Sequence, residues 1–293
     1  MPRGVPNAGF RKTAAAVARM GNGPAMLAKA TPVLAVSNET DAEIEARLGE
    51  RFDILSTLTG AVVTGDARAL IVSGPAGLGK SYTVEKALEA WDPEQLQHTI
   101  VKGYVKTTGL YKLLYQYRRP NQVIVFDDAD TIFYDDNSLN LLKAVCDTTE
   151  RRVVSYLAET SMVDEESAER IPRSFTFEGT IVFITNLDFD ALIDKGHKLA
   201  PHLEALVSRS HYIDLAMKTR RDYMIRIKQV LKQGLLKAQG LDAQQEADVI
   251  AFLDKHQDKL RELSLRVAIK IGALRKMGKP NWANVAKVTC CKN

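Results

Sequence analysis

The chain has 293 residues, of which 45% are hydrophobic and 26% are charged, and its formal net charge is +4. This balance is ordinary for a globular protein and excludes the collagen-like, coiled-coil and low-complexity classes. Apolar runs such as 123–126 and 181–184 are far shorter than the roughly 20 residues that cross a bilayer, so no membrane partner is expected. Cys146, Cys290 and Cys291 lack metal-ligand and redox-motif spacing, and no signal-peptide pattern precedes them, which favours a cytoplasmic protein.

The first segment, residues 1–39, is basic and shows no stable hydrophobic period. Residues 1–30 contain no acid and carry five basic side chains: Arg3, Arg11, Lys12, Arg19 and Lys29. A mixture of Pro, Gly, Ala and basic residues predicts a flexible arm. A dedicated DNA-binding arm is the alternative interpretation, because basic segments also contact phosphates.

Hydrophobic periodicity predicts the elements that follow the arm. Thr40 and Glu43 form a capping-box pattern, and apolar residues at helical spacing then predict a helix over 41–63. Beyond it, the pattern predicts strands over 69–73, 99–105, 123–126, 152–157 and 180–185, and helices over 80–91, 108–117 and 138–146. Strands buried on both faces and separated by helices indicate a doubly wound α/β fold with a parallel sheet.

The strand pattern disappears from residue 219 onward. Helices are predicted over 219–238, 243–260, 263–276 and 282–288. The expected domains are therefore the basic arm over 1–39, an α/β domain over 40–217 and a small all-α domain over 218–293.

The segment between the strand over 69–73 and the helix over 80–91 matches the phosphate-loop pattern G-x-x-x-x-G-K-[ST]. Its residues are Gly74, Pro75, Ala76, Gly77, Leu78, Gly79, Lys80 and Ser81. Such a loop surrounds a polyphosphate with backbone N–H groups at a helix N-terminus. We expect ATP to bind these residues and the following Tyr82, with Lys80 on the β- and γ-phosphates and the Ser81 hydroxyl on Mg²⁺.

Two acids follow the buried strand over 123–126. A carboxylate at the tip of a strand beside the phosphate loop can hold Mg²⁺, and we assign that role to Asp127. Asp128 is then expected to orient the attacking water. Acids at a strand end can instead be solvated turn residues.

The segment 127–132, with the sequence DDADTI, resembles the Walker B segment of the AAA+ ATPases, in which the second position is usually Glu. Later segments resemble that family in the same order. Asn186, after the strand over 180–185, matches the sensor 1 position, Arg209 matches the arginine finger, and Arg266 matches sensor 2. Turn-capping for Asn186 and ordinary surface positions for the two arginines are the alternatives.

The resemblance covers roughly 40–278 and implies a P-loop (AAA+) fold with a helical lid, which hydrolyses Mg²⁺-ATP. It also implies a homo-oligomeric ring or spiral, most often a hexamer, with ATP sites shared between subunits. In such a site Arg209 would act in trans, whereas Asn186 and Arg266 would act within the chain. Asp128 is one methylene shorter than the usual Glu, so hydrolysis is expected to be slower or to use Asp130.

Two further segments bear on the substrate. The stretch between Asp130 and Asn186 resembles the hairpin inserted before sensor 1 in some members of the family, and an ordinary surface hairpin is the alternative. The segment 102–111 occupies the place of a pore loop. There Tyr104 could grip a polypeptide, whereas Lys102, together with Lys106 and Lys112, could contact nucleic-acid phosphates.

The function that the resemblance implies is an AAA+ ATPase that remodels a macromolecule. Small proteins of this kind occur in tailed bacteriophages, which favours DNA or a nucleoprotein as the partner and the host cytoplasm as the location. A protein unfoldase or chaperone, and a slow nucleotide-gated assembly switch, are the alternative functions.

Overall fold

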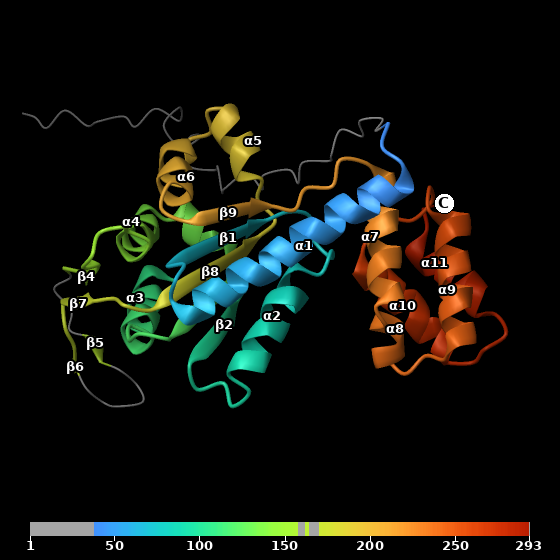
Figure 1. Ribbon diagram of the computed structural model, residues 1–293, viewed down its shortest axis with the longest axis horizontal. Coiled ribbons are helices and arrows are strands. Elements are labelled where there is room, and N and C mark those ends of the chain that lie inside the picture. The colour runs from blue at the N-terminus through green and yellow to red at the C-terminus, as the bar shows by residue number, and fades with distance from the viewer. Residues whose placement is uncertain (1–37, 158–161, 164–169, 293) are drawn as a thin grey trace, which may run out of the picture. The chain divides into compact units, whose positions relative to one another are not determined.

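The computed structural model describes residues 38–157, 162–163 and 170–292 (Figure 1), so residues 1–37 of the predicted arm lie outside the described residues. The strands are β1 (Ala69–Ser73), β2 (His98–Lys102), β3 (Val123–Asp127), β4 (Val153–Ser155), β5 (Met162–Val163), β6 (Arg170–Ile171), β7 (Ser174–Thr176), β8 (Thr180–Thr185) and β9 (His211–Asp214). The helices are α1 (Asp41–Thr64), α2 (Lys80–Trp91), α3 (Thr107–Gln116), α4 (Asp136–Val145), α5 (Phe189–Asp194), α6 (Ala200–Val207), α7 (Arg220–Lys232), α8 (Leu235–Ala238), α9 (Ala243–His256), α10 (Leu265–Lys276) and α11 (Trp282–Cys290), with a 3-10 turn η2 (Asp130–Tyr134).

The main sheet has five parallel strands in the order β2-β3-β8-β1-β9. This confirms the predicted doubly wound α/β fold class. The register places Ser73 at the end of β1 beside Thr185 and Asp214, and Asp127 at the end of β3 beside Lys102. Because parallel strands all end at the same edge, the segments after β1, β3 and β8 meet there.

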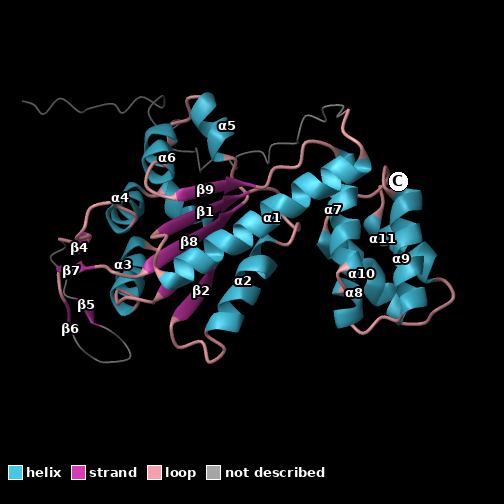
Figure 2. Ribbon diagram, viewed as in Figure 1, coloured by secondary structure: helices cyan, strands magenta, loops and turns pink. Residues whose placement is uncertain are grey.

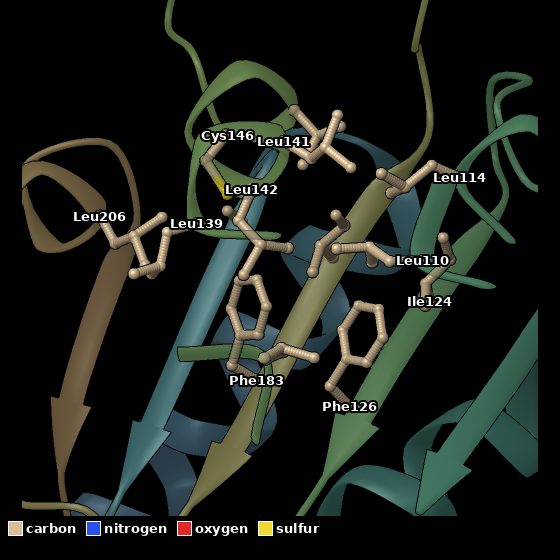
Figure 3. Packing of buried hydrophobic residues seen from close by; sticks show 14 of the residues in the cluster. Leu110, Leu114, Ile124, Phe126, Leu139, Leu141, Leu142, Cys146, Phe183 and Leu206 are labelled. Atoms are coloured by element: carbon tan, nitrogen blue, oxygen red, sulfur yellow. The ribbon is translucent and has the colours of Figure 1, made fainter. Parts of the chain in front are cut away.

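Helices cover both faces of this sheet (Figure 2), which explains why its strands read as continuous apolar runs. Side chains alternate along a strand, so Leu70 and Val72 of β1 pack in the core shared with α1 and α2, whereas Ile71 belongs to the opposite core. Figure 3 shows that second core, where Phe126 and Phe183 stack with ring centroids 5.7 Å apart beneath leucines of α3 and α4.

The sequence predicted that the run over 152–157 is a strand of the parallel sheet, and this prediction was wrong. Its strand β4 pairs antiparallel with β7, and β5 pairs antiparallel with β6. Only Val154 of β4 is buried, so the run is apolar on one face and lacks the two-sided burial of a central strand. The fifth strand of the sheet is instead β9, which lies in a region where the sequence predicted no strand.

Local signals account for the helix boundaries. The predicted capping box is present, with the Thr40 side chain accepting from the backbone of Glu43 at the start of α1. The helix predicted over 219–238 is divided, because Gly234 adopts the left-handed conformation (φ +93°) between α7 and α8.

Helices α7 to α11 share a separate hydrophobic core. A domain border near residue 217 stays a prediction, and none of the described helices is long and apolar enough to span a membrane.

Candidate nucleotide site

The phosphate loop connects β1 to α2 as predicted. Gly77 and Gly79 both have positive φ, at +75° and +96°, a backbone conformation that residues with a Cβ rarely adopt. The Leu78 side chain is fully buried in the core, so only its backbone can face a ligand. Gly79 caps α2 without any side-chain hydrogen bond to the helix. The first N–H groups of α2 therefore lack a side-chain cap, which suits an anion.

Lys80 is the buried cation of the loop, with 5% of its surface exposed. Its ammonium donates to the carbonyl oxygens of Gly74 and Pro75 and, over 2.9 Å, to Oδ1 of Asn186. These bonds use the three donors of the group, so a phosphate would replace protein acceptors rather than fill a gap. Burial lowers the pKa of Lys80 from 10.5 to about 8, although the neighbouring carboxylates oppose this shift.

The two predicted metal-binding residues lie side by side. The Ser81 hydroxyl donates to Oδ1 of Asp127 over 2.8 Å, and Asp127 is buried at the end of β3. A hydroxyl and a carboxylate beside a phosphate loop form an oxygen donor set that fits Mg²⁺. The other Asp127 oxygen lies 3.1 Å from Nζ of Lys102, which also contacts Glu85 at 2.7 Å. Lys102 therefore faces the candidate site, and the sequence had not suggested this position.

Asn186 links the loop to the second acid. Its Nδ2 donates to Oδ1 of Asp128 over 2.6 Å, while its Oδ1 accepts from Lys80. Asp128 is exposed and has a left-handed backbone (φ +54°), and its N–H donates to Ile184 in β8. Non-glycine residues in this conformation are uncommon and often lie at functional sites. The structure thus brings together the predicted Walker B and sensor 1 residues.

The helical region touches the loop through the start of α10. The Leu265 N–H donates to the Gly77 carbonyl over 2.7 Å, and a Cβ on Gly77 would lie 2.6 Å from Cβ of Ser264. The next residue, Arg266, is exposed, and its positive charge adds a small contribution to the lowering of the Lys80 pKa, which burial mainly causes. From α7, the buried Arg226 places its Nε 3.5 Å from the Leu78 carbonyl oxygen.

Two predicted site residues do not join this group. Tyr82 is 53% exposed on α2, with the Lys86 ammonium 5.4 Å from its ring centroid. Arg209 follows α6 and donates to the carbonyl of Ala205. It precedes β9, whose first residue is level with Leu70, so it lies on the order of 15 Å along the strands from the phosphate loop. Arg209 therefore lies at the amino edge of the sheet and cannot reach its own loop.

Sequence reasoning missed two partners of the site besides Lys102. One is Arg226, which carried no motif. The other is Thr185, whose hydroxyl donates to Oδ1 of Asp130 over 2.6 Å. If the end of the second strand had been predicted correctly, Lys102 would have been expected beside Asp127 at the carboxyl edge of the sheet. The strand was predicted to continue to 105, but it ends at Lys102, before Gly103 with φ +97°.

Comparison with known proteins shows a relative of clear sequence similarity in a bacteriophage. The chain is 37% identical over 250 residues to the uncharacterized 36.7 kDa protein in the nrdC-mobD intergenic region of Enterobacteria phage T4, covering 85% of the chain and 76% of that protein. No protein-family model matches the chain.

Solved structures with similar folds include ATP-complexed NtrX from Brucella abortus (14% identity, TM-score 0.44), the Thermotoga maritima RuvB Holliday junction branch migration motor (13%, 0.45) and Aeropyrum pernix ORC2 (15%, 0.44). The alignments cover 86%, 85% and 84% of this chain, and 54%, 69% and 68% of those proteins. The chain thus spans about half of NtrX. It belongs to the family of the phage T4 protein, and its fold is a five-stranded parallel sheet flanked by helices, in which a G-x-x-x-x-G-K-S segment joins β1 to α2.

Proposed function

We propose that the protein binds Mg²⁺-ATP at the carboxyl edge of its sheet and hydrolyses it to ADP and phosphate. The observation that carries this proposal is the continuous contact of Lys80 with Asn186 and of Asn186 with Asp128, beside the Ser81–Asp127 pair. A buried ammonium, a hydroxyl–carboxylate pair and an exposed acid are the groups that phosphoryl transfer to water requires.

Each group has a distinct role in this proposal. Lys80 exchanges its bonds to loop carbonyls for bonds to the β- and γ-phosphates. Ser81 and Asp127 would hold Mg²⁺, which supplies positive charge against the phosphate oxygens. Asp128 accepts a hydrogen bond from the attacking water, and Asn186 holds that carboxylate toward the loop. Because Asp128 is shorter than Glu, turnover is expected to be slow.

The location of Arg209 supports a shared site. It cannot reach the loop of its own chain, whereas a neighbouring subunit could present it to that loop. A head-to-tail ring or spiral of identical chains, with six as the expected number, would place an Arg209 at each site. Arg266 of α10 would act on the nucleotide within its own chain.

The pKa of Lys80 leads to a pH prediction. Phosphates bind the ammonium form, so ATP raises this pKa and binding takes up a proton above pH 8. Affinity for ATP should therefore be constant below about pH 8 and fall by up to about tenfold per unit above it. Calorimetric titrations from pH 7 to pH 9.5 measure this, with Lys80→Arg as the control that stays charged. A flat profile for the native protein would contradict the assignment.

The macromolecular partner is proposed to be DNA or a nucleoprotein. Between β2 and α3, Tyr104 is 71% exposed next to Gly103, and Lys106 is exposed nearby. An aromatic ring and a cation on a loop suit bases and phosphates. ATPase assays with and without single- and double-stranded DNA test this. Stimulation that weakens with salt supports it, whereas no stimulation and no salt-sensitive binding would exclude it.

Tyr104 also favours a second function, because an exposed ring beside glycine can grip an extended polypeptide. Stimulation of the ATPase by an unfolded protein, but not by DNA, would indicate an unfoldase.

Asp128 favours a third function, a slow assembly switch. Turnover at the rate of ordinary kinases or ATPases, above about one per second, would exclude that switch.

A further inference from the structure

The end of β8 carries a polar pair that the proposed roles do not use. Thr185 is the last residue of the strand and is fully buried. Its hydroxyl donates to Oδ1 of Asp130 over 2.6 Å and accepts from the N–H of Leu187 over 3.0 Å. A buried hydroxyl that both donates and accepts holds its neighbours in one arrangement. The Thr185 hydroxyl therefore joins the two ends of the turn that contains Asn186 and attaches that turn to Asp130.

The turn is attached at two other points. The Leu187 carbonyl accepts from the hydroxyl of Ser73, the last residue of β1 before the phosphate loop, over 2.7 Å. On the other side, burial raises the pKa of Asp130, and the hydrogen bonds that this carboxylate accepts from the Thr185 hydroxyl and the Asn186 backbone N–H oppose the rise. The carboxylate of Asp130 thus faces the turn.

These contacts determine the place of the Asn186 side chain. Its amide lies between Nζ of Lys80 at 2.9 Å and Oδ1 of Asp128 at 2.6 Å, so a small displacement of the turn would break one of the two bonds. Hydrogen bonds weaken steeply with length and misalignment. Asp128 itself is exposed, and Asn186 is the side chain that connects it to the loop.

We propose that Asp130 and Thr185 are positioning residues, which hold Asn186 in place so that Asp128 stays directed at the phosphate loop. This inference rests on the proposed ATPase function and assigns the base role to Asp128 alone. Asp130 is already engaged by the Thr185 hydroxyl on one oxygen, and it acts through Asn186 rather than on water.

The test separates positioning from simple stability. Thr185→Val removes the hydroxyl and should lower kcat by roughly 10- to 100-fold, the cost of a small misplacement, with KM and the affinity for a fluorescent ATP analogue changed less than about twofold. Thr185→Ser keeps the hydroxyl and should restore kcat. Thr180→Val is the matched control, because Thr180 is a buried threonine at the opposite end of β8.

A double-mutant cycle tests the route through Asn186. On an Asn186→Ala background, Thr185→Val and Asp130→Asn should each cost less than about twofold more, because the residue that they position is already lost. Melting temperatures show whether each variant folds. Additive losses, or equal losses for Thr185→Val and Thr180→Val, would overturn the proposal.

Three other outcomes identify which idea has failed. If the native protein turns over ATP and Thr185→Val keeps native kcat, the positioning role is wrong and the ATPase function stands. If Asp130→Asn loses more than about 10³-fold while Thr185→Val loses little, Asp130 acts directly on water and the proposal is wrong. If the native protein has no turnover with any nucleotide, the proposed function fails and this inference fails with it.

Discussion

Lys80→Ala is expected to weaken ATP binding by at least about 100-fold, because bonds from an ammonium to phosphate are charge-assisted and residues 74–81 of the loop contain no other cation. Asn186 and the carbonyls of Gly74 and Pro75 would lose their donor as well. Calorimetry with ATP and Mg²⁺ measures the affinity. Circular dichroism shows whether the variant remains folded.

The control for this variant is Lys287→Ala, which removes an exposed lysine from α11 and changes the net charge equally. It should bind ATP as the native protein does. Native affinity in Lys80→Ala would overturn the phosphate-loop assignment.

Arg209→Ala is expected to retain ATP affinity and to lose at least about 10³-fold in kcat, as when an arginine finger is removed. The reason is its position at the amino edge of the sheet, from which the proposed head-to-tail assembly would present it to the site of a neighbour. Steady-state ATPase rates and calorimetric affinities measure the two effects separately. Arg119→Ala, which removes an exposed arginine before β3, should be fully active.

Mixing two inactive variants tests whether the site is shared. In a mixed assembly, a subunit with Arg209→Ala supplies an intact Lys80 site, and a neighbour with Lys80→Ala supplies Arg209. Activity should therefore appear in the mixture although each variant alone is inactive. No recovery in an assembly proven to be mixed would contradict an arginine acting in trans.

The sequence by itself determined the phosphate loop and the elements around it. β1, α2 and β8 have the predicted bounds, because a glycine loop between a buried strand and a helix is a local pattern. It also placed Asn186 and Asp128 at strand ends, and strand ends of a parallel sheet must converge. The prediction for the run over 152–157 was wrong because apolar content alone does not distinguish a central strand from a hairpin strand that is buried on one face.

Tertiary structure alone decided which side chains meet. The Lys102–Asp127 pair requires β2 to lie beside β3, and the Thr185–Asp130 pair requires β8 to follow them in the sheet. The contact of α10 with Gly77 joins segments nearly 190 residues apart, which no local pattern encodes. Strand order and register are long-range properties set by packing of the two cores. Strand order and register place Lys80 in a network with Asn186 and Asp128 at the carboxyl edge of the sheet, and they place Arg209 at its amino edge.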